Sequence, residues 1–207
     1  MKILQVGAVS DEEIFARGLP GQDVADTVAA ILADVRQNGD EALARYTEKF
    51  DGARPDPLEV SAEEKAAAFA ATDPEFLAVL QTAANNIRAF HTAQVRQSFV
   101  QTGSDGVVMG QKILPLAKVG LYVPGGTAAY PSSVLMNAIP AQIAGVGEIV
   151  MVTPAHHGII PTAILAAAQV AGVTRIFKLG GAQAVAALAY GTQSVPRVEK
   201  IVGPGNA

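Results

Sequence analysis

The chain has 207 residues, of which 50% are hydrophobic, with no cysteine, three histidines and a net charge of −4. The lack of cysteine excludes disulfides, thiolate catalysis and cysteine-type zinc sites, and the hydrophobic content excludes a disordered chain. The mild net acidity argues against nucleic acid as a main partner, because phosphate binding usually requires a basic patch.

Charge is unevenly distributed along the chain. Residues 1–103 hold 16 Asp and Glu and 9 Lys and Arg, whereas residues 104–207 hold 3 and 6. The first half is therefore typical of solvated helices and the second of a largely buried segment. No charge lies between Lys118 and Glu148, but the prolines and glycines of this stretch argue against a membrane span. With an N-terminus unlike a signal peptide, we expect a cytoplasmic protein.

The first hundred residues are predicted to be mainly helical. Apolar spacing predicts a helix that starts at Asp23 or Asp26 and ends at Asn38-Gly39. A second helix is expected from Asp40, as its cap, to Asp51-Gly52.

Two further start signals follow, and then a break. Ser61 and Glu64 have the spacing of a capping box, and Thr72-Asp73-Pro74 precedes a long helical pattern. Beyond it, residues 103–110 indicate a turn-rich break, and Val107–Met109 and Lys112–Leu114 are expected to be short strands that pair as a hairpin.

From Ala117 onward, strand and helix patterns alternate. Apolar strands are predicted at 119–123, 148–153, 173–179 and 198–202. Helices are predicted between them, from Ser132 or Ser133 to Ala144, over 161–171, and from Gly180-Gly181 to Gly191. This alternation predicts an α/β protein with a parallel sheet that is covered on both faces.

Three of the four predicted strands end in glycine-rich segments, at 124–126, 180–181 and 203–205. Ligands of such sheets bind beyond the carboxyl ends of the strands, and a helix N-terminus favours an anion. Gly180-Gly181 is equally compatible with a plain strand-to-helix turn, because the sequence lacks a G-x-G-x-x-G motif.

The histidines do not form a metal-ligand pattern. Adjacent side chains of an extended segment point in opposite directions, so His156 and His157 rarely share an ion, and His91 lies within the long helical pattern. Because zinc usually requires three or four ligands, we predict no metal site built from this chain alone.

Four motifs resemble the histidinol dehydrogenase family, and they occur in the family's order. The resemblance extends over essentially the whole chain and is strongest from Val119 onward. The motifs lie at Gly120–Gly126, Tyr130–Asn137, Gly180–Thr192 and Lys200–Ala207.

The resemblance implies oxidation of L-histidinol to L-histidine in two NAD-dependent steps through an aldehyde, with a bound zinc ion. It implies that Tyr122, Gln183 and Asn206 contact NAD, and that the full-length protein is a homodimer that acts on a small-molecule substrate. As the charge and the proline and glycine pattern indicate, no nucleic-acid or membrane partner is expected. The zinc ligands and the catalytic Glu-His pair of the family lie further along the family's chain. No catalytic or metal-binding residue is therefore assigned within this sequence.

The resemblance also implies a domain organisation. Residues 1–116 are expected to be the mainly helical first half of a discontinuous domain, and residues 117–207 an incomplete Rossmann-like cofactor domain. The chain thus resembles an N-terminal portion, which is expected to be inactive alone. Two alternatives stay open: a family relative that oxidises another small alcohol, such as a sulfonated diol, and a truncated, non-catalytic nucleotide-binding or dimerisation module.

Overall fold

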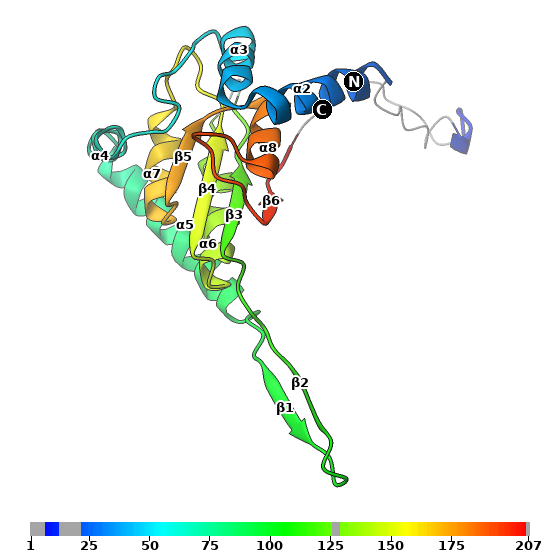
Figure 1. Cartoon of the computed structure of the whole chain (residues 1–207). Coiled ribbons are helices and arrows are strands. Elements are labelled where there is room, and N and C mark those ends of the chain that lie inside the picture. The colour runs from blue at the N-terminus through cyan, green and yellow to red at the C-terminus, as the bar shows by residue number, and fades with distance from the viewer. Residues whose placement is uncertain (1–6, 13–21, 126–128, 206–207) are drawn as a thin grey trace.

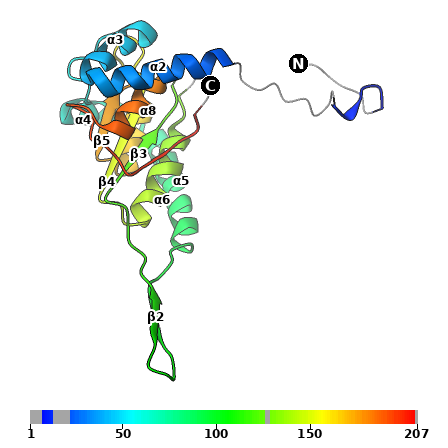
Figure 2. The same ribbon diagram turned by 45° about the vertical axis from the view of Figure 1, so that its right-hand side comes forward.

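A computed structural model describes residues 7–12, 22–125 and 129–205. A parallel sheet lies between two helical layers, and a long hairpin extends from one end of this body (Figures 1 and 2). The helices within these ranges are α2 (Gln22–Asn38), α3 (Asp40–Asp51), α4 (Ala62–Ala70), α5 (Pro74–Thr92), α6 (Pro131–Ile143), α7 (Thr162–Val170) and α8 (Gly181–Tyr190). The strands are β1 (Phe99–Thr102), β2 (Val108–Gln111), β3 (Lys118–Tyr122), β4 (Glu148–Thr153), β5 (Arg175–Lys178) and β6 (Lys200–Val202).

The main sheet has the strand order β5-β4-β3-β6, and all of its pairings are parallel. The predicted four-stranded parallel sheet is therefore confirmed. Right-handed crossovers place α6 and α7 on one face and α8 on the other, because the chain reverses direction across the sheet after β5. The order matches the first four strands of a doubly wound fold, with its switch point between β3 and β6.

Helices from the first 92 residues complete both layers. Leu80 and Ala84 of α5 are buried in the core where α5 packs against α6 and α7. On the other face, Val35 of α2 and Leu43 of α3 are buried with the apolar side chains of α8. The division into domains at residues 116 and 117 stays a prediction. None of the helices in the described ranges combines the length and apolarity that a bilayer crossing requires.

Local signals in the sequence set several helix starts. The Ser61 hydroxyl accepts from the Glu64 N–H at 3.1 Å, and the Glu64 carboxylate accepts from the Ser61 N–H at 2.9 Å, which confirms the capping box. Helix α5 begins at Pro74 as the start signal predicts, and Asp73 caps it by accepting from the Glu75 N–H at 2.7 Å.

The predicted cap at Asp40 is wrong. Gly39 occupies the cap position of α3, with a positive φ of 53°. The Asp40 N–H instead donates to the side chain of Gln193, 2.9 Å away, and the Asp40 carboxylate accepts from Ser194. A distant loop therefore satisfies this helix end, and no local pattern indicates such a contact.

Two further local predictions are corrected. The hairpin pairs Phe99–Thr102 with Val108–Gln111, and Lys112–Leu114 is not a strand. Its turn closes with the Gly103 N–H donating to the Val107 carbonyl at 2.8 Å, which fixes the register. The serines expected to cap α6 lie inside its first turn, because Pro131 takes the first helical position, where its missing N–H costs nothing.

Candidate functional site

Two of the side chains predicted from the sequence lie together at the carboxyl edge of the sheet. Tyr122 is the last residue of β3, and Gln183 lies in the first turn of α8. The Gly181 N–H donates to the Tyr122 hydroxyl at 3.2 Å, which joins the end of β3 to the start of α8. The third predicted residue, Asn206, lies outside the described residues.

Gln183 carries the most informative polar group at this edge. Its residue is 1% exposed, and neither its Nε2 nor its Oε1 has a hydrogen-bond partner in the described part of the chain. A buried amide without partners costs free energy, so native proteins rarely retain one without a reason. A ligand that offers both an acceptor and a donor would satisfy this side chain.

The N-terminus of α8 lies beside this amide and has no cap from its own N-cap residue, although the Tyr122 hydroxyl accepts from its first N–H, that of Gly181. Gly180 at the cap position offers no side-chain hydrogen bond, and the first turn holds no acidic residue. The first N–H groups of a helix carry a partial positive charge, which attracts anions such as phosphate. The combination suits a ligand with an anionic part and a hydrogen-bonding part.

Glycines bring the strand-end loops into direct contact. A Cβ on Gly180 would lie 2.6 Å from Pro154 Cβ, and a Cβ on Gly125 would overlap the same proline ring. Gly181, with φ of 62°, leaves room for the Gln183 amide, because a Cβ there would lie 2.7 Å from Gln183 Oε1. Pro154, which directly follows β4, therefore lies between the loop after β3 and the loop after β5 and is in close contact with both.

The loop after β6 joins this arrangement through Gly203. Its φ is 151°, and any Cβ there would overlap the backbone carbonyl of Tyr122. The backbones that follow β3 and β6 are therefore in close contact at the switch point between these two strands. Sequence reasoning identified these glycines as a group but missed Pro154, for which the signal is a proline immediately after a buried strand.

The nearly buried Lys178, at the end of β5, has an anionic partner within the protein. Its Nζ lies 2.5 Å from Glu64 Oε1. This hydrogen bond holds the pKa of Glu64 below its ordinary value. Because the two charges compensate each other, attraction of an anion to this edge rests on the backbone N–H groups of α8.

The residues in the described ranges do not fit a zinc site. They bring together no group of three or more His, Asp or Glu side chains that could hold a metal ion. His156 lies in the loop between β4 and α7, and His91 lies near the end of α5. We therefore derive no chemical step through a metal in this chain.

The strand order and the glycine-rich switch point define a doubly wound α/β protein. A family model described as histidinol dehydrogenase matches residues 17–207. A histidinol dehydrogenase of Syntrophotalea carbinolica is 58% identical over 93% of this chain and 46% of its own length. One of Geobacillus kaustophilus is 53% identical, over 100% and 49%.

A solved structure gives the same result. The histidinol dehydrogenase of Elizabethkingia anophelis superposes with a TM-score of 0.87 at 37% identity, over 92% of this chain and 44% of that one. The chain therefore belongs to the histidinol dehydrogenase family. It spans about half the length of the relatives that it matches.

Proposed function

We propose that this chain is the cofactor-binding portion of an NAD-dependent enzyme that oxidises L-histidinol to L-histidine through the aldehyde, at the end of histidine biosynthesis. The observation that carries the proposal is the buried, unpartnered Gln183 amide at the start of α8, beside the Tyr122 hydroxyl. Membership of the family supports the reaction. We further propose that the complete enzyme is a cytoplasmic homodimer.

Each residue at the edge has a role in this proposal. The ring of Tyr122 offers a face for stacking, and the amides of Gln183 and Asn206 each offer a donor and an acceptor. Gly180 and Gly181 let the cofactor approach the backbone, and the α8 N-terminus contributes about 0.3–1 kcal/mol toward a phosphate. When bound, NAD accepts a hydride in each oxidation step.

The remaining chemistry is proposed to lie outside this chain. In family members the zinc ligands and the Glu-His pair that moves protons follow the segment matched here. On this basis the chain alone binds the dinucleotide but does not oxidise histidinol. The substrate is therefore selected by residues other than those described above.

A titration of the 207-residue chain with NADH, followed by the fluorescence of the nicotinamide, tests the binding. We expect Gln183→Ala to weaken binding by about three- to tenfold, which is the loss of one neutral hydrogen bond. Gln169→Ala, on the exposed face of α7, is the matched control and should bind NADH as the native chain does. Unchanged affinity in a folded Gln183→Ala chain would contradict the assignment.

A chimera tests the reaction. This chain replaces the matching half of the Geobacillus kaustophilus relative, and NADH formation is followed with L-histidinol and with a sulfonated diol. We expect turnover of L-histidinol, with a raised KM for NAD in the Gln183→Ala chimera. A folded chimera that binds NADH but oxidises neither alcohol would favour the non-catalytic module.

A further inference from the structure

The hydroxyl of Tyr122 occupies the first N–H group of α8. The Gly181 N–H donates to this hydroxyl, 3.2 Å away. It is one of the donors at a helix start that lack a partner within the helix and attract anions. A phenol hydroxyl is a neutral acceptor, and hydrogen bonds to neutral acceptors are weaker than those to charged oxygens. A phosphate oxygen is therefore a better partner for this N–H than the hydroxyl that holds it.

The amide of Gln183, two residues further along α8, is enclosed by the chain itself. Its Nε2 and Oε1 are both buried and have no hydrogen-bond partner in the described ranges. Because the atoms that bury the amide belong to this chain, neither a cofactor nor another part of a longer protein reaches it in this conformation. A ligand contacts the amide only after a group beside it has moved.

Gly181 is in contact with both groups. Its N–H is held by the Tyr122 hydroxyl, and a Cβ on its other side would lie 2.7 Å from Gln183 Oε1. Its φ of 62° lies in the left-handed region, and another glycine, Gly180, precedes it. Hinge positions absorb changes of backbone angles, and two consecutive glycines restrict such changes least. Release of the hydroxyl thus frees the residue against which the amide is packed.

Two states of the helix start follow from these contacts. In the closed state, which the structure shows, the hydroxyl bonds to Gly181 and the Gln183 amide is unpaired. In the open state the N–H is free for an anion and the amide is free for a donor and an acceptor. A ligand that carries both kinds of group binds the open state alone, and it shifts the population toward that state.

We propose that Tyr122 is a latch on the cofactor site. Its hydroxyl holds the start of α8 closed in the free chain, and a phosphate of the dinucleotide displaces it and gives access to Gln183. The inference rests on the proposed function, because the dinucleotide is the ligand proposed there, and it concerns the regulation of the same site. A hydroxyl that bonds to the cofactor would lose affinity on removal, whereas a hydroxyl that competes with the cofactor gains affinity on removal.

Tyr122→Phe in the 207-residue chain removes the hydroxyl and keeps the ring. In a titration followed by nicotinamide fluorescence, we expect this variant to bind NADH about two- to tenfold more tightly, which is the strength of one neutral hydrogen bond. Tyr190→Phe makes the same change at the far end of α8, where the residue is 42% exposed, and should bind NADH as the native chain does. Unchanged or weaker binding by Tyr122→Phe would overturn the latch.

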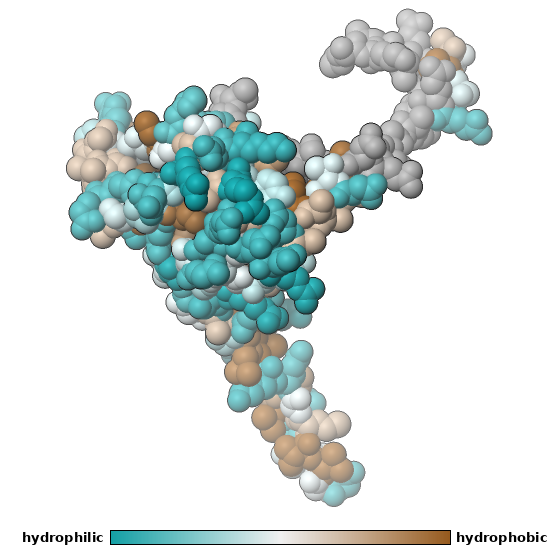
Figure 3. Space-filling model, turned by 45° about the horizontal axis from the view of Figure 1, so that its top comes forward, coloured by the Kyte–Doolittle hydropathy of each residue, from teal (hydrophilic) through white to brown (hydrophobic). Residues whose placement is uncertain are grey.

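Inorganic pyrophosphate, measured as a competitor of NADH, tests the anionic part alone. It has no apolar surface, so it gains nothing from the hydrophobic side chains that are exposed along the hairpin of β1 and β2 (Figure 3). Tyr122→Phe should tighten pyrophosphate binding by a factor similar to that for NADH. Adenosine, which has no phosphate, should bind equally to both chains. Tighter adenosine binding without tighter pyrophosphate binding, or no competition by pyrophosphate in either chain, would overturn displacement by a phosphate.

Hydrogen exchange of the Gly181 amide, followed by ¹⁵N NMR, tests the closed state. Loss of its hydrogen bond in Tyr122→Phe should speed exchange about two- to tenfold and lower the Tm of the ligand-free chain by about 2–4 °C. A hydroxyl with a merely structural role would lower stability and NADH affinity together. Lower stability with tighter binding is therefore specific to the latch, and unchanged exchange of this amide would contradict it.

Gln183→Ala separates failure of the latch from failure of the proposed function. Weaker NADH binding in Gln183→Ala with unchanged binding in Tyr122→Phe would overturn the latch and leave the cofactor at this edge of the sheet. Unchanged binding in both folded variants would overturn both proposals, because the dinucleotide would then lie elsewhere.

Discussion

Replacing Gln183 with methionine separates two effects of the buried amide, its effect on the stability of the fold and its effect on NADH binding. Methionine has a similar length, no polar atom that needs a partner, and flexibility to fill the same space. The amide has two buried polar atoms without partners in the described structure, and each unsatisfied group costs about 1–3 kcal/mol. We expect Gln183→Met to raise the free energy of unfolding of the ligand-free chain by about 1–3 kcal/mol.

The assay is urea and thermal unfolding followed by circular dichroism. In a chain of this size each kcal/mol corresponds to about 2–4 °C in Tm. The control Gln169→Met, at an exposed position of α7, should change stability by less than about 0.5 kcal/mol. The same Gln183→Met chain should bind NADH at least about threefold more weakly, because it loses the hydrogen bonds that the amide offers.

A substitution that raises the stability of the fold and weakens NADH binding indicates that the native side chain serves ligand binding and not folding. A Gln183→Met chain that is less stable than the native chain would show that the amide contributes to folding. Greater stability with unchanged NADH affinity would show that the amide serves something other than this cofactor. Either result would refute the reasoning that links its burial to binding.

Two further predictions concern the same edge of the sheet. Gly180→Ala forces a methyl group against Pro154, so it should lower NADH affinity about tenfold or more by moving the start of α8. Gln169→Ala, at an exposed position of α7, should have little effect in the same titration. The pKa of Glu64 is lowered by its hydrogen bond from Lys178, so the stability that this pair gives is present above the ordinary glutamate pKa and is lost as the pH falls through the lowered value. Urea unfolding between about pH 5 and pH 2 should therefore show a shallower acid dependence for Glu64→Gln than for the native chain.

The sequence predicts the sheet well because each buried strand is a short apolar run between breaking residues. β4 at Glu148–Thr153 has the predicted bounds, since Gly147 precedes it and Pro154 follows it. Parallel pairing follows because helical patterns separate the strands. A helix cap can be predicted where its hydrogen-bond partner lies three residues away, as for Ser61. The prediction fails where the partner is distant in the sequence, as for Asp40.

The candidate site is only partly predictable for the same reason. Glycine-rich strand ends indicate the correct edge, and the family resemblance indicates Tyr122 and Gln183. The hydrogen bond from Gly181 to the Tyr122 hydroxyl joins residues 59 positions apart. The contact of Pro154 with two glycine loops also depends on strand order. Such contacts exist only after the sheet has formed, so no local pattern in the sequence encodes them.

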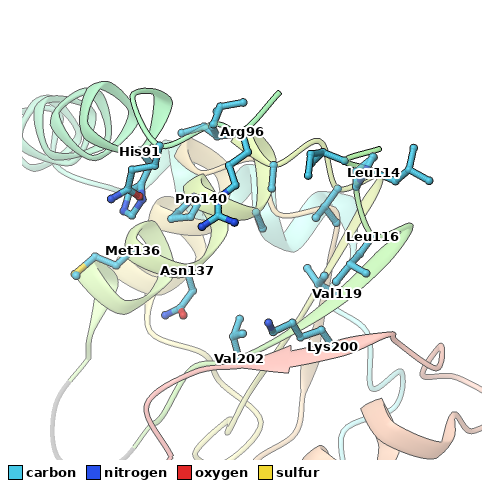
Figure 4. A pocket seen from close by; sticks show the side chains of 18 residues that line it. His91, Arg96, Leu114, Leu116, Val119, Met136, Asn137, Pro140, Lys200 and Val202 are labelled. Atoms are coloured by element: carbon cyan, nitrogen blue, oxygen red, sulfur yellow. The ribbon is translucent and has the colours of Figure 1, made fainter. Parts of the chain in front are cut away.

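A groove beside the hairpin of β1 and β2, lined in part by Leu114, Met136 and Lys200 (Figure 4), should be functionally independent of the carboxyl edge of the sheet. The groove has a volume suitable for a small ligand, but it is lined mainly by apolar side chains, which include Val119 of β3 and both ends of β6. The unpartnered amide belongs to α8, which packs in the core on the other face of the sheet. Met136→Ala, which changes an exposed side chain of the groove, should therefore leave NADH affinity within about twofold of the native chain, as for sites without shared contacts. The same titration must show weakening for Gln183→Met, and a loss of affinity in Met136→Ala would place the dinucleotide in the groove instead.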